Sequence, residues 1–301
     1  MPTSPPATPL RTPHRLFRPP AEGDSLILRV ADGCPHNACA FCAMYKGVPY
    51  RVREPAEVRR DLEAARRDWP DAGRIFLADG DVMALPFTRL RDLLDDLNAR
   101  FPRLARVGVY ANGSSILAKS DAELRALRER KLHTLYLGLE SGDETTLRRM
   151  HKGETAAGMT EAVRRAQACG LRLSVMILTG VAGRDRSAAH AAATAAVLNR
   201  MQPRLLSALR CTPIPGTALH AAIAAGAFQP LTEHEAVAEL RAILAGLELA
   251  GTVFRANHAS NSVPLEGRLP KDRTALLAAL DALLAADVLD RQTPGPTPWC
   301  L

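Results

Sequence analysis

Aromatic side chains are scarce in this chain of 301 residues, because Phe, Tyr and Trp together make up only 4% of it. A surface that stacks nucleic-acid bases needs aromatic side chains among its basic residues. The formal net charge is +7, and much of the excess is arginine on expected helices: Arg59, Arg60, Arg66, Arg67, Arg125, Arg128 and Arg130. We interpret these arginines as solvated helix faces. A nucleic-acid partner is therefore not favoured, although the charge leaves it open.

Long hydrophobic runs are also missing from the chain. No apolar run reaches the roughly 20 residues that a membrane helix needs. Residues 1–20 contain no hydrophobic segment of the kind that a secretory signal carries. We therefore expect a cytoplasmic protein that does not contact a membrane. Thiols stay reduced in the cytoplasm, so neighbouring cysteines in such a protein indicate a metal site more than a disulfide.

Three of the six cysteines lie within one short stretch of the sequence. Cys34, Cys39 and Cys42 follow the apolar segment 25–30 with the spacing C-x-x-x-x-C-x-x-C. Thiolates at this spacing can all reach one metal centre. They complete neither a zinc tetrahedron nor a four-cysteine iron–sulfur cage, so a fourth ligand comes from elsewhere or one metal corner stays open. A structural zinc site closed by His36 is the alternative.

Short apolar runs alternate with amphipathic helical patterns along most of the chain. The expected strands are 25–30, 74–79, 107–113, 133–142, 171–180 and 205–209. This repeated alternation implies parallel strands with right-handed crossovers and helices outside. We expect the α/β class, as a partial TIM-like (β/α)6 barrel with a small C-terminal helical extension. The expected parts are a disordered or strap-like segment (1–22), the core barrel (23–219) and an extension that covers the barrel mouth (220–301).

Polar residues follow most of the expected strands, and in a parallel barrel the carboxyl ends of the strands converge on one mouth. The residues at these ends are Gly80, Asp81, Asn112, Glu140, Ser141, Gly180, Arg210 and Cys211. Glu140 is the hardest to explain by structure alone, because a carboxylate at the end of a buried strand needs a partner. The Asp-Gly and Asn-Gly pairs and the lone glycines could instead be ordinary turns.

Taken in order, these motifs resemble the radical S-adenosylmethionine (SAM) superfamily, in the branch related to coproporphyrinogen dehydrogenase and the Elongator catalytic subunit. The resemblance covers about residues 25–219. It rests on the cysteine loop with Phe41 before the last cysteine, on Asp-Gly-Asp at the place of a GGE motif, on GLESG followed by Lys-Gly, and on PIPGTAL. The loop has one residue more between its first two cysteines than the commonest pattern of the family.

The resemblance implies that Cys34, Cys39 and Cys42 hold a [4Fe–4S] cluster whose remaining iron binds SAM. The residues implied in SAM binding are Phe41, Gly80, Asp81, Asn112, Glu140, Ser141 and Gly180. A flavodoxin- or ferredoxin-type donor would reduce the cluster, and SAM would be cleaved to a 5′-deoxyadenosyl radical that abstracts hydrogen from a substrate still unknown. Two alternatives stay open: a non-redox zinc protein or RNA-binding module, and a degenerate scaffold that binds SAM without radical chemistry.

Three further residues are candidates for contact with the substrate. Arg210 could bind an anionic group through a bidentate contact. Cys211 could donate a hydrogen atom or could be inert packing. His258 lies in the polar stretch 254–267 between two expected helices and is the candidate there for acid–base work. That stretch could be a strand and loop that closes the barrel, or a solvated connection.

Overall fold

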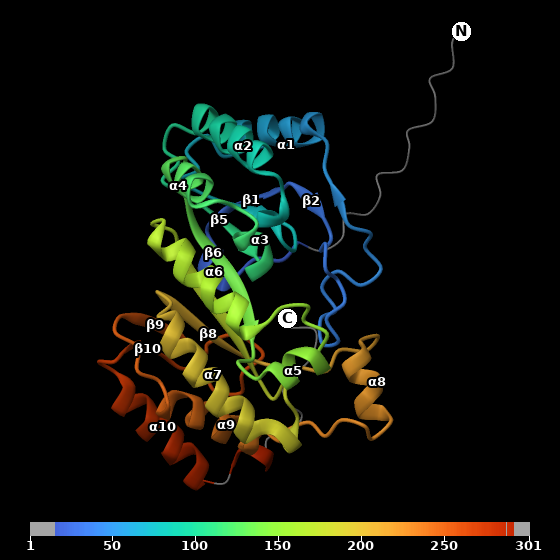
Figure 1. The fold of residues 1–301 in the computed structure, drawn as a ribbon, viewed down its shortest axis with the longest axis vertical. Coiled ribbons are helices and arrows are strands. Elements are labelled where there is room, and N and C mark those ends of the chain that lie inside the picture. Colours follow the sequence, from blue (N-terminus) through green and yellow to red (C-terminus); the bar gives the residue numbers. More distant parts are fainter. Residues whose placement is uncertain (1–15, 287, 292–301) are drawn as a thin grey trace.

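A computed structural model describes residues 16–286 and 288–291 of the chain (Figure 1). Its centre is one sheet of eight strands in the order β1-β4-β5-β6-β7-β8-β9-β10. The parallel strands are β1 (Leu26–Arg29), β4 (Arg74–Ala78), β5 (Arg106–Ala111), β6 (Leu132–Glu140), β7 (Arg172–Thr179), β8 (Leu205–Arg210) and β9 (Thr252–Arg255). The last strand, β10 (Glu266–Leu269), is antiparallel to β9. Because β1 and β10 are the two edges of this sheet, it is a partial barrel, as predicted.

Helices cover the outer face of the sheet (Figure 1). The long ones are α1 (Pro55–Asp68), α2 (Phe87–Arg100), α4 (Asp121–Glu129), α6 (Ala156–Ala168), α7 (Ser187–Met201), α9 (Glu233–Ala245) and α10 (Arg273–Ala286). Local sequence determines several of their starts: Pro55 is the first residue of α1, and the Ser120 side chain accepts from the Glu123 amide at the start of α4. Three short helices are α3 (Gly113–Leu117), α5 (Glu144–Arg149) and α8 (Ala218–Ala224). The described helices include none that is long and apolar enough to cross a membrane.

The two faces of the sheet carry different side chains, because successive residues of a strand point to opposite sides. On β8, Leu206 and Ala208 belong to the large core between the sheet and the helices. The inner face holds a separate cluster in which Phe76, Tyr110 and Tyr136 meet edge to face, with Phe76 and Tyr110 centroids 5.1 Å apart. The few aromatic residues of the chain therefore help to fill the barrel interior.

The C-terminal part of the chain continues the central sheet and its outer helical layer. In its described residues, β9 pairs with β8 and continues the parallel sheet, while α9 packs between α7 and α10 in the outer helical layer (Figure 1). Two buried side chains hold β9 in place: Phe254 belongs to the large core, and the Thr252 hydroxyl donates to the carbonyl of Pro203 at 2.6 Å. Only residues 16–22 of the expected N-terminal segment are described, and Cys300 also lies outside the described residues.

Candidate active site

The three clustered cysteines lie on one closed loop above the barrel. This loop, residues 33–50, connects β2 (Ala31–Asp32) to β3 (Arg51–Val52), and the two short strands pair antiparallel. The guanidinium of Arg51 holds the base of the loop, since it lies 2.7 Å from Asp32 and 2.6 Å from Glu57. Cys34, Cys39 and Cys42 are free thiols, and each is partly exposed. The loop therefore presents three available sulfurs from a fixed base.

The end of β4 contacts the first cysteine directly. The Gly80 amide donates to the carbonyl of Gly33 at 3.1 Å. A β-carbon built at Gly80 would lie 2.5 Å from the β-carbon of Cys34, closer than real side chains approach one another. Glycine is therefore required at this position, because any side chain would displace the first cysteine of the loop.

We expect Gly80→Ala to lower the amount of iron that the reconstituted protein retains. The added methyl group forces Cys34 to move, and overpacking of this kind costs roughly 1–3 kcal/mol. Iron and sulfide analysis measures the effect. Gly73→Ala is the matched control, because the nearest atom to a β-carbon at Gly73 is 3.5 Å away. If both variants keep the same iron content as the unchanged protein, Gly80 does not position Cys34.

Two other segments hold the middle of the cysteine loop. The Ala40 amide donates to the carbonyl of Met150 at 2.9 Å, and the Leu219 amide, on α8, donates to the carbonyl of Ala40 at 2.9 Å. The Nε2 atom of His36 is 2.7 Å from the carbonyl oxygen of His151. The histidine that a zinc site would use as its fourth ligand is thus bonded to the turn after α5.

A buried ion pair lies beside the cysteines. Glu140 ends β6 with a positive φ of 60°, and its carboxylate accepts from Lys152 Nζ at 3.0 Å. The two side chains are only 12% and 8% exposed. A β-carbon built at Gly138 would clash with a carboxylate oxygen of Glu140. The carboxylate of Glu140 therefore occupies space that a side chain at Gly138 would need. The expected partner of Glu140 is therefore a lysine that the sequence prediction left outside the site.

The charge of Lys152 also acts on the cysteines. Burial raises the pKa of the Cys39 thiol to about 11, and the nearby ammonium of Lys152 opposes this shift. Burial alone would lower the pKa of Lys152, but the carboxylate of Glu140 and the Cys39 thiol raise it above its usual value. Lys152 is therefore protonated at neutral pH. Its positive charge lies next to the cysteines and favours their negatively charged thiolate form.

The ends of β4 and β5 meet in a second polar group. The carboxylate of Asp81 accepts from Ser115 Oγ at 2.9 Å, from the Asn112 amide at 3.3 Å and from Asn112 Nδ2 at 3.1 Å. Burial raises the pKa of Asp81, and the bonds from Ser115 and Asn112 oppose that shift. Burial and the nearby Asp81 and Cys34 raise the pKa of Tyr50, so this tyrosine lies close to both. The structure thus brings Asp81 and Asn112 together near the first cysteine.

Ser141 and Gly180 belong to a buried network behind the mouth. Ser141 Oγ lies 2.7 Å from His190 Nδ1 on α7, and its side chain is fully buried. His190 Nε2 lies 3.6 Å from the carboxylate of Glu239 on α9, which in turn accepts from the Gly180 amide at 2.6 Å. Burial lowers the pKa of His190 to about 4, so it is neutral at pH 7. Ser141 therefore points toward α7 and connects two strand ends through the helical layer.

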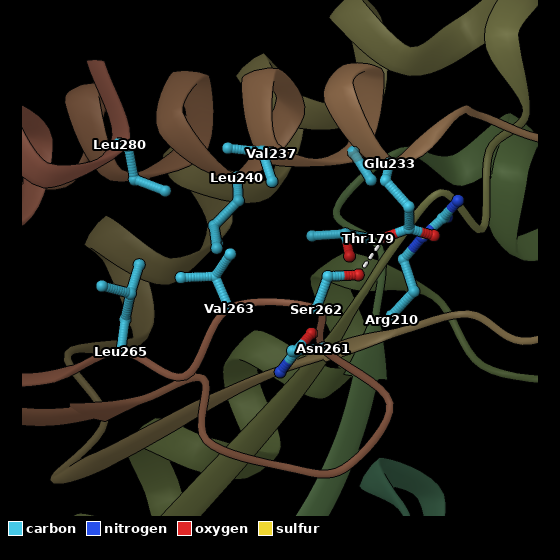
Figure 2. Close-up of a pocket in the computed structure, with 11 residues that line it drawn as sticks. Thr179, Arg210, Glu233, Val237, Leu240, Asn261, Ser262, Val263, Leu265 and Leu280 are labelled. Atoms are coloured by element: carbon cyan, nitrogen blue, oxygen red, sulfur yellow. Dashed lines mark hydrogen bonds and ion pairs between the residues drawn. The ribbon is translucent and has the colours of Figure 1, made fainter. Parts of the chain in front are cut away.

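Arg210 and Cys211 point to opposite faces of the sheet. Arg210 shares the side of Leu206 and Ala208, and its guanidinium donates to the carbonyl of Leu231 at 2.6 Å and lies 3.4 Å from Glu233. Figure 2 shows this polar end of a pocket on the helical side, whose other end is apolar. The lining includes Val237, Leu240, Val263, Leu265 and Leu280. The structure therefore places Arg210 outside the mouth, because neighbouring residues of a strand alternate between faces.

Cys211 lies on the side of the cysteine loop. It packs in an apolar cluster that includes Ala40 and Met150, with Phe41 against it. Burial raises the pKa of its thiol to about 12, so it is a neutral thiol at physiological pH. Cys211 and Phe41 together form an apolar wall next to the loop.

His258 occupies a tight turn after β9, at the edge of the sheet. Its Nδ1 accepts from the Ser260 amide at 3.1 Å and lies 2.9 Å from Ser260 Oγ. The same hydroxyl accepts from the Arg210 amide at 3.1 Å. Burial lowers the pKa of His258, so its imidazole is neutral at pH 7. The Nδ1 atom of His258 thus orients Ser260, and the hydroxyl of Ser260 joins this turn to the end of β8.

The donor set of the cysteine loop can be compared with the candidate metal groups. Within residues 16–286 and 288–291, no three side chains of His, Cys, Asp or Glu converge closely enough to hold one metal ion. An iron–sulfur cluster uses one thiolate for each iron, so its cysteines stand farther apart than the ligands of a single ion. Three free thiols beside the Lys152 ammonium fit a [4Fe–4S] cluster that keeps one iron open.

Known proteins match both this sequence and this fold. A family model described as "Radical SAM superfamily" matches residues 28–193. The "Probable threonylcarbamoyladenosine tRNA methylthiotransferase" of Pyrococcus abyssi (strain GE5 / Orsay) is 29% identical over 200 residues. That alignment covers 64% of this chain and 45% of the relative. The chain thus spans less than half the length of the curated relative that it matches.

Two solved structures have similar folds at low sequence identity. Coproporphyrinogen III oxidase (HemN) from Escherichia coli superimposes with a TM-score of 0.54 at 13% identity, over 73% of this chain and 51% of that chain. Methylornithine synthase (PylB) does so with a TM-score of 0.53 at 17% identity, over 85% of this chain and 68% of that chain. At such identities the likeness concerns the fold alone.

Proposed function

Because this chain belongs to the radical SAM superfamily, we propose that it uses its cysteine loop and the strand ends below it to start a radical reaction on a bound substrate. It is a radical SAM enzyme, and the cofactors of that family are a [4Fe–4S] cluster and SAM. The observation that carries the proposal is the meeting of three free thiols with the buried Glu140–Lys152 pair at one end of the sheet.

In this proposal Cys34, Cys39 and Cys42 hold the cluster. A reduced cluster held there would supply the electron for the reductive cleavage of SAM. Lys152 stabilises the thiolates electrostatically and holds the carboxylate of Glu140 in place. The amide and hydroxyl bonds to Asp81 orient its carboxyl group, whose oxygens could accept from an ammonium group.

The other predicted residues have supporting roles in the proposal. Phe41 and Cys211 form the apolar wall that keeps water away from reactive groups. Ser141 and Gly180 are positioning residues, because the chain from Ser141 through His190 and Glu239 fixes the ends of β6 and β7. Arg210 and His258 act on the same edge: they hold the turn after β9 against β8.

The tRNA named for the Pyrococcus relative belongs to a protein of which this chain spans only 45%. A flavodoxin- or ferredoxin-type protein is the proposed source of electrons. The mouth between the cysteine loop and the inner face of β7 and β8 is the proposed place of the substrate.

The first test needs no substrate. The protein is purified and reconstituted without oxygen, its iron and sulfide are counted, and 5′-deoxyadenosine is measured after addition of dithionite and SAM. We expect roughly four irons per chain and deoxyadenosine that accumulates with time. A colourless protein with one zinc would refute the proposal. An intact cluster without deoxyadenosine would leave a scaffold that binds SAM and would refute the radical step.

A further inference from the structure

The opposite end of the barrel, far from the cysteine loop, gathers basic side chains that are scattered in the sequence. Several strands and the turns before them begin with a cation. These residues are Arg74 on β4, Arg106 on β5, Arg128 and Lys131 before β6, and Arg172 on β7. We call them the basic end. Arg128, in the last turn of α4, is the one residue among them that the sequence analysis interpreted as part of a solvated helix face.

The residues of the basic end are close in space. Arg74 and Arg106 are direct partners in the register of β4 and β5. His133, on β6, lies among the others: burial and the charges of Arg172, Arg128 and Arg106 lower its pKa. Like charges directly opposite each other on neighbouring strands are destabilising. The cations of the basic end therefore repel one another, and the sheet does not need these charges in order to form.

Few carboxylates of the described residues pair with the cations of the basic end. In the part of the chain that the structure describes, Arg74, Arg128, Lys131 and Arg172 take part in no ion pair, and Arg106 reaches only Glu22, at 4.0 Å. Glu22 is itself buried, and it accepts from Tyr136 Oη at 2.5 Å. Arg128 is oriented by a bond to the carbonyl of Gly170 at 2.8 Å. This end of the barrel thus carries several cations that form no ion pair with a carboxylate among the described residues.

We propose that the basic end binds the phosphodiester backbone of a nucleic acid. Strands lie about 4.8 Å apart, so the row from Arg74 on β4 to Arg172 on β7 spans roughly 14 Å. A linear row of cations suits a linear polyanion better than the rounded acidic surface of a protein. Guanidinium groups match phosphate oxygens in bidentate geometry.

The bound nucleic acid is recognised by its backbone and not by its bases. The five residues of the basic end are cations, and contacts of cations with phosphate oxygens carry no base information. Binding is therefore expected to be independent of base sequence and to weaken steeply with salt. This activity goes beyond the radical reaction, because the basic end and the cysteine loop lie at opposite ends of the strands.

Fluorescence anisotropy with a labelled single-stranded RNA of roughly 16 nucleotides tests the proposal on the reconstituted full chain. Each phosphate contact with a single strand contributes about fivefold to affinity at 0.1 M salt. We expect Arg74→Gln/Arg172→Gln to weaken binding about 25-fold and to reduce the log–log salt slope by about 1.4. DNA of the same sequence should bind with similar affinity and lose it equally in this variant.

The matched control is Arg59→Gln/Arg60→Gln on α1, which removes the same charge from two exposed arginines elsewhere. It should retain the affinity and salt slope of the unchanged protein. An equal loss in both double variants would show a non-specific charge effect, and no loss in either would remove the basic end as a site. Competition by polyaspartate as strong as that by RNA would favour an acidic protein partner and overturn the proposal. Both variants should still form deoxyadenosine, which confirms that they are folded.

Discussion

Cys42→Ala is expected to abolish deoxyadenosine formation and to leave the reconstituted protein with well under the roughly four irons of an intact cluster. Cys42 is one of three thiols on a loop fixed at its base and at its middle, and the two described cysteines outside this loop, Cys169 and Cys211, are both buried. The nearest remaining candidate, Cys211, packs in the apolar wall as a neutral thiol. Iron and sulfide analysis and mass spectrometry of the reaction measure both losses.

The control for this change is Cys169→Ala, because Cys169 is a buried cysteine at the end of α6, outside the loop. It should keep full iron content and full deoxyadenosine formation, apart from a small loss of stability. Equal iron in Cys42→Ala and in the unchanged protein would contradict the assignment of Cys42 as a ligand. Equal loss in both variants would point to a general failure of folding.

Lys152→Met is expected to destabilise the protein by about 3–5 kcal/mol, which is the usual cost of removing one partner of a buried ion pair. The change leaves the carboxylate of Glu140 buried and without its cation, since that side chain is only 12% exposed. It also removes the positive charge next to Cys39. Urea denaturation followed by two independent probes gives the free energy of unfolding.

Two companion variants separate the charge from the packing. Lys152→Arg keeps a cation and should retain most of the stability, whereas Glu140→Gln/Lys152→Met removes both charges and should recover much of the loss. The double variant should still bind SAM poorly in calorimetry, because the proposed site has lost both polar groups. If Lys152→Met unfolds with the same free energy as the unchanged protein, the pair is not a buried electrostatic contact.

Much of the fold could be predicted from local patterns. The six expected strands correspond to β1 and β4 to β8, with ends that differ by at most two residues, because apolar runs between turn residues report burial directly. β9 was foreseen only as one alternative for the stretch after residue 252, and β10 was not predicted. The sequence of β10, Glu-Gly-Arg-Leu, lacks the apolar pattern of a buried strand. This segment is a strand because it pairs antiparallel with β9.

The candidate site was predictable where the chain itself keeps residues together. The three cysteines lie within one loop, so their spacing alone placed them near one another. Lys152 was seen as part of a motif but not as the partner of Glu140, because twelve residues and a helix separate the two. The only sign of Lys152 in the sequence was the Lys-Gly pair after the fourth expected strand.

The sequence by itself determined the strand and helix pattern, the cysteine loop and membership of the radical SAM superfamily, since spacing and periodicity are local properties of the chain. Only the tertiary structure decided where individual side chains point. The register shift between Gly138 and Glu140 and the positive φ of Glu140 turn Ser141 toward α7, and strand alternation turns Arg210 toward α9. The basic end likewise exists only once the strands align, because sheet register brings together charges that lie far apart along the chain.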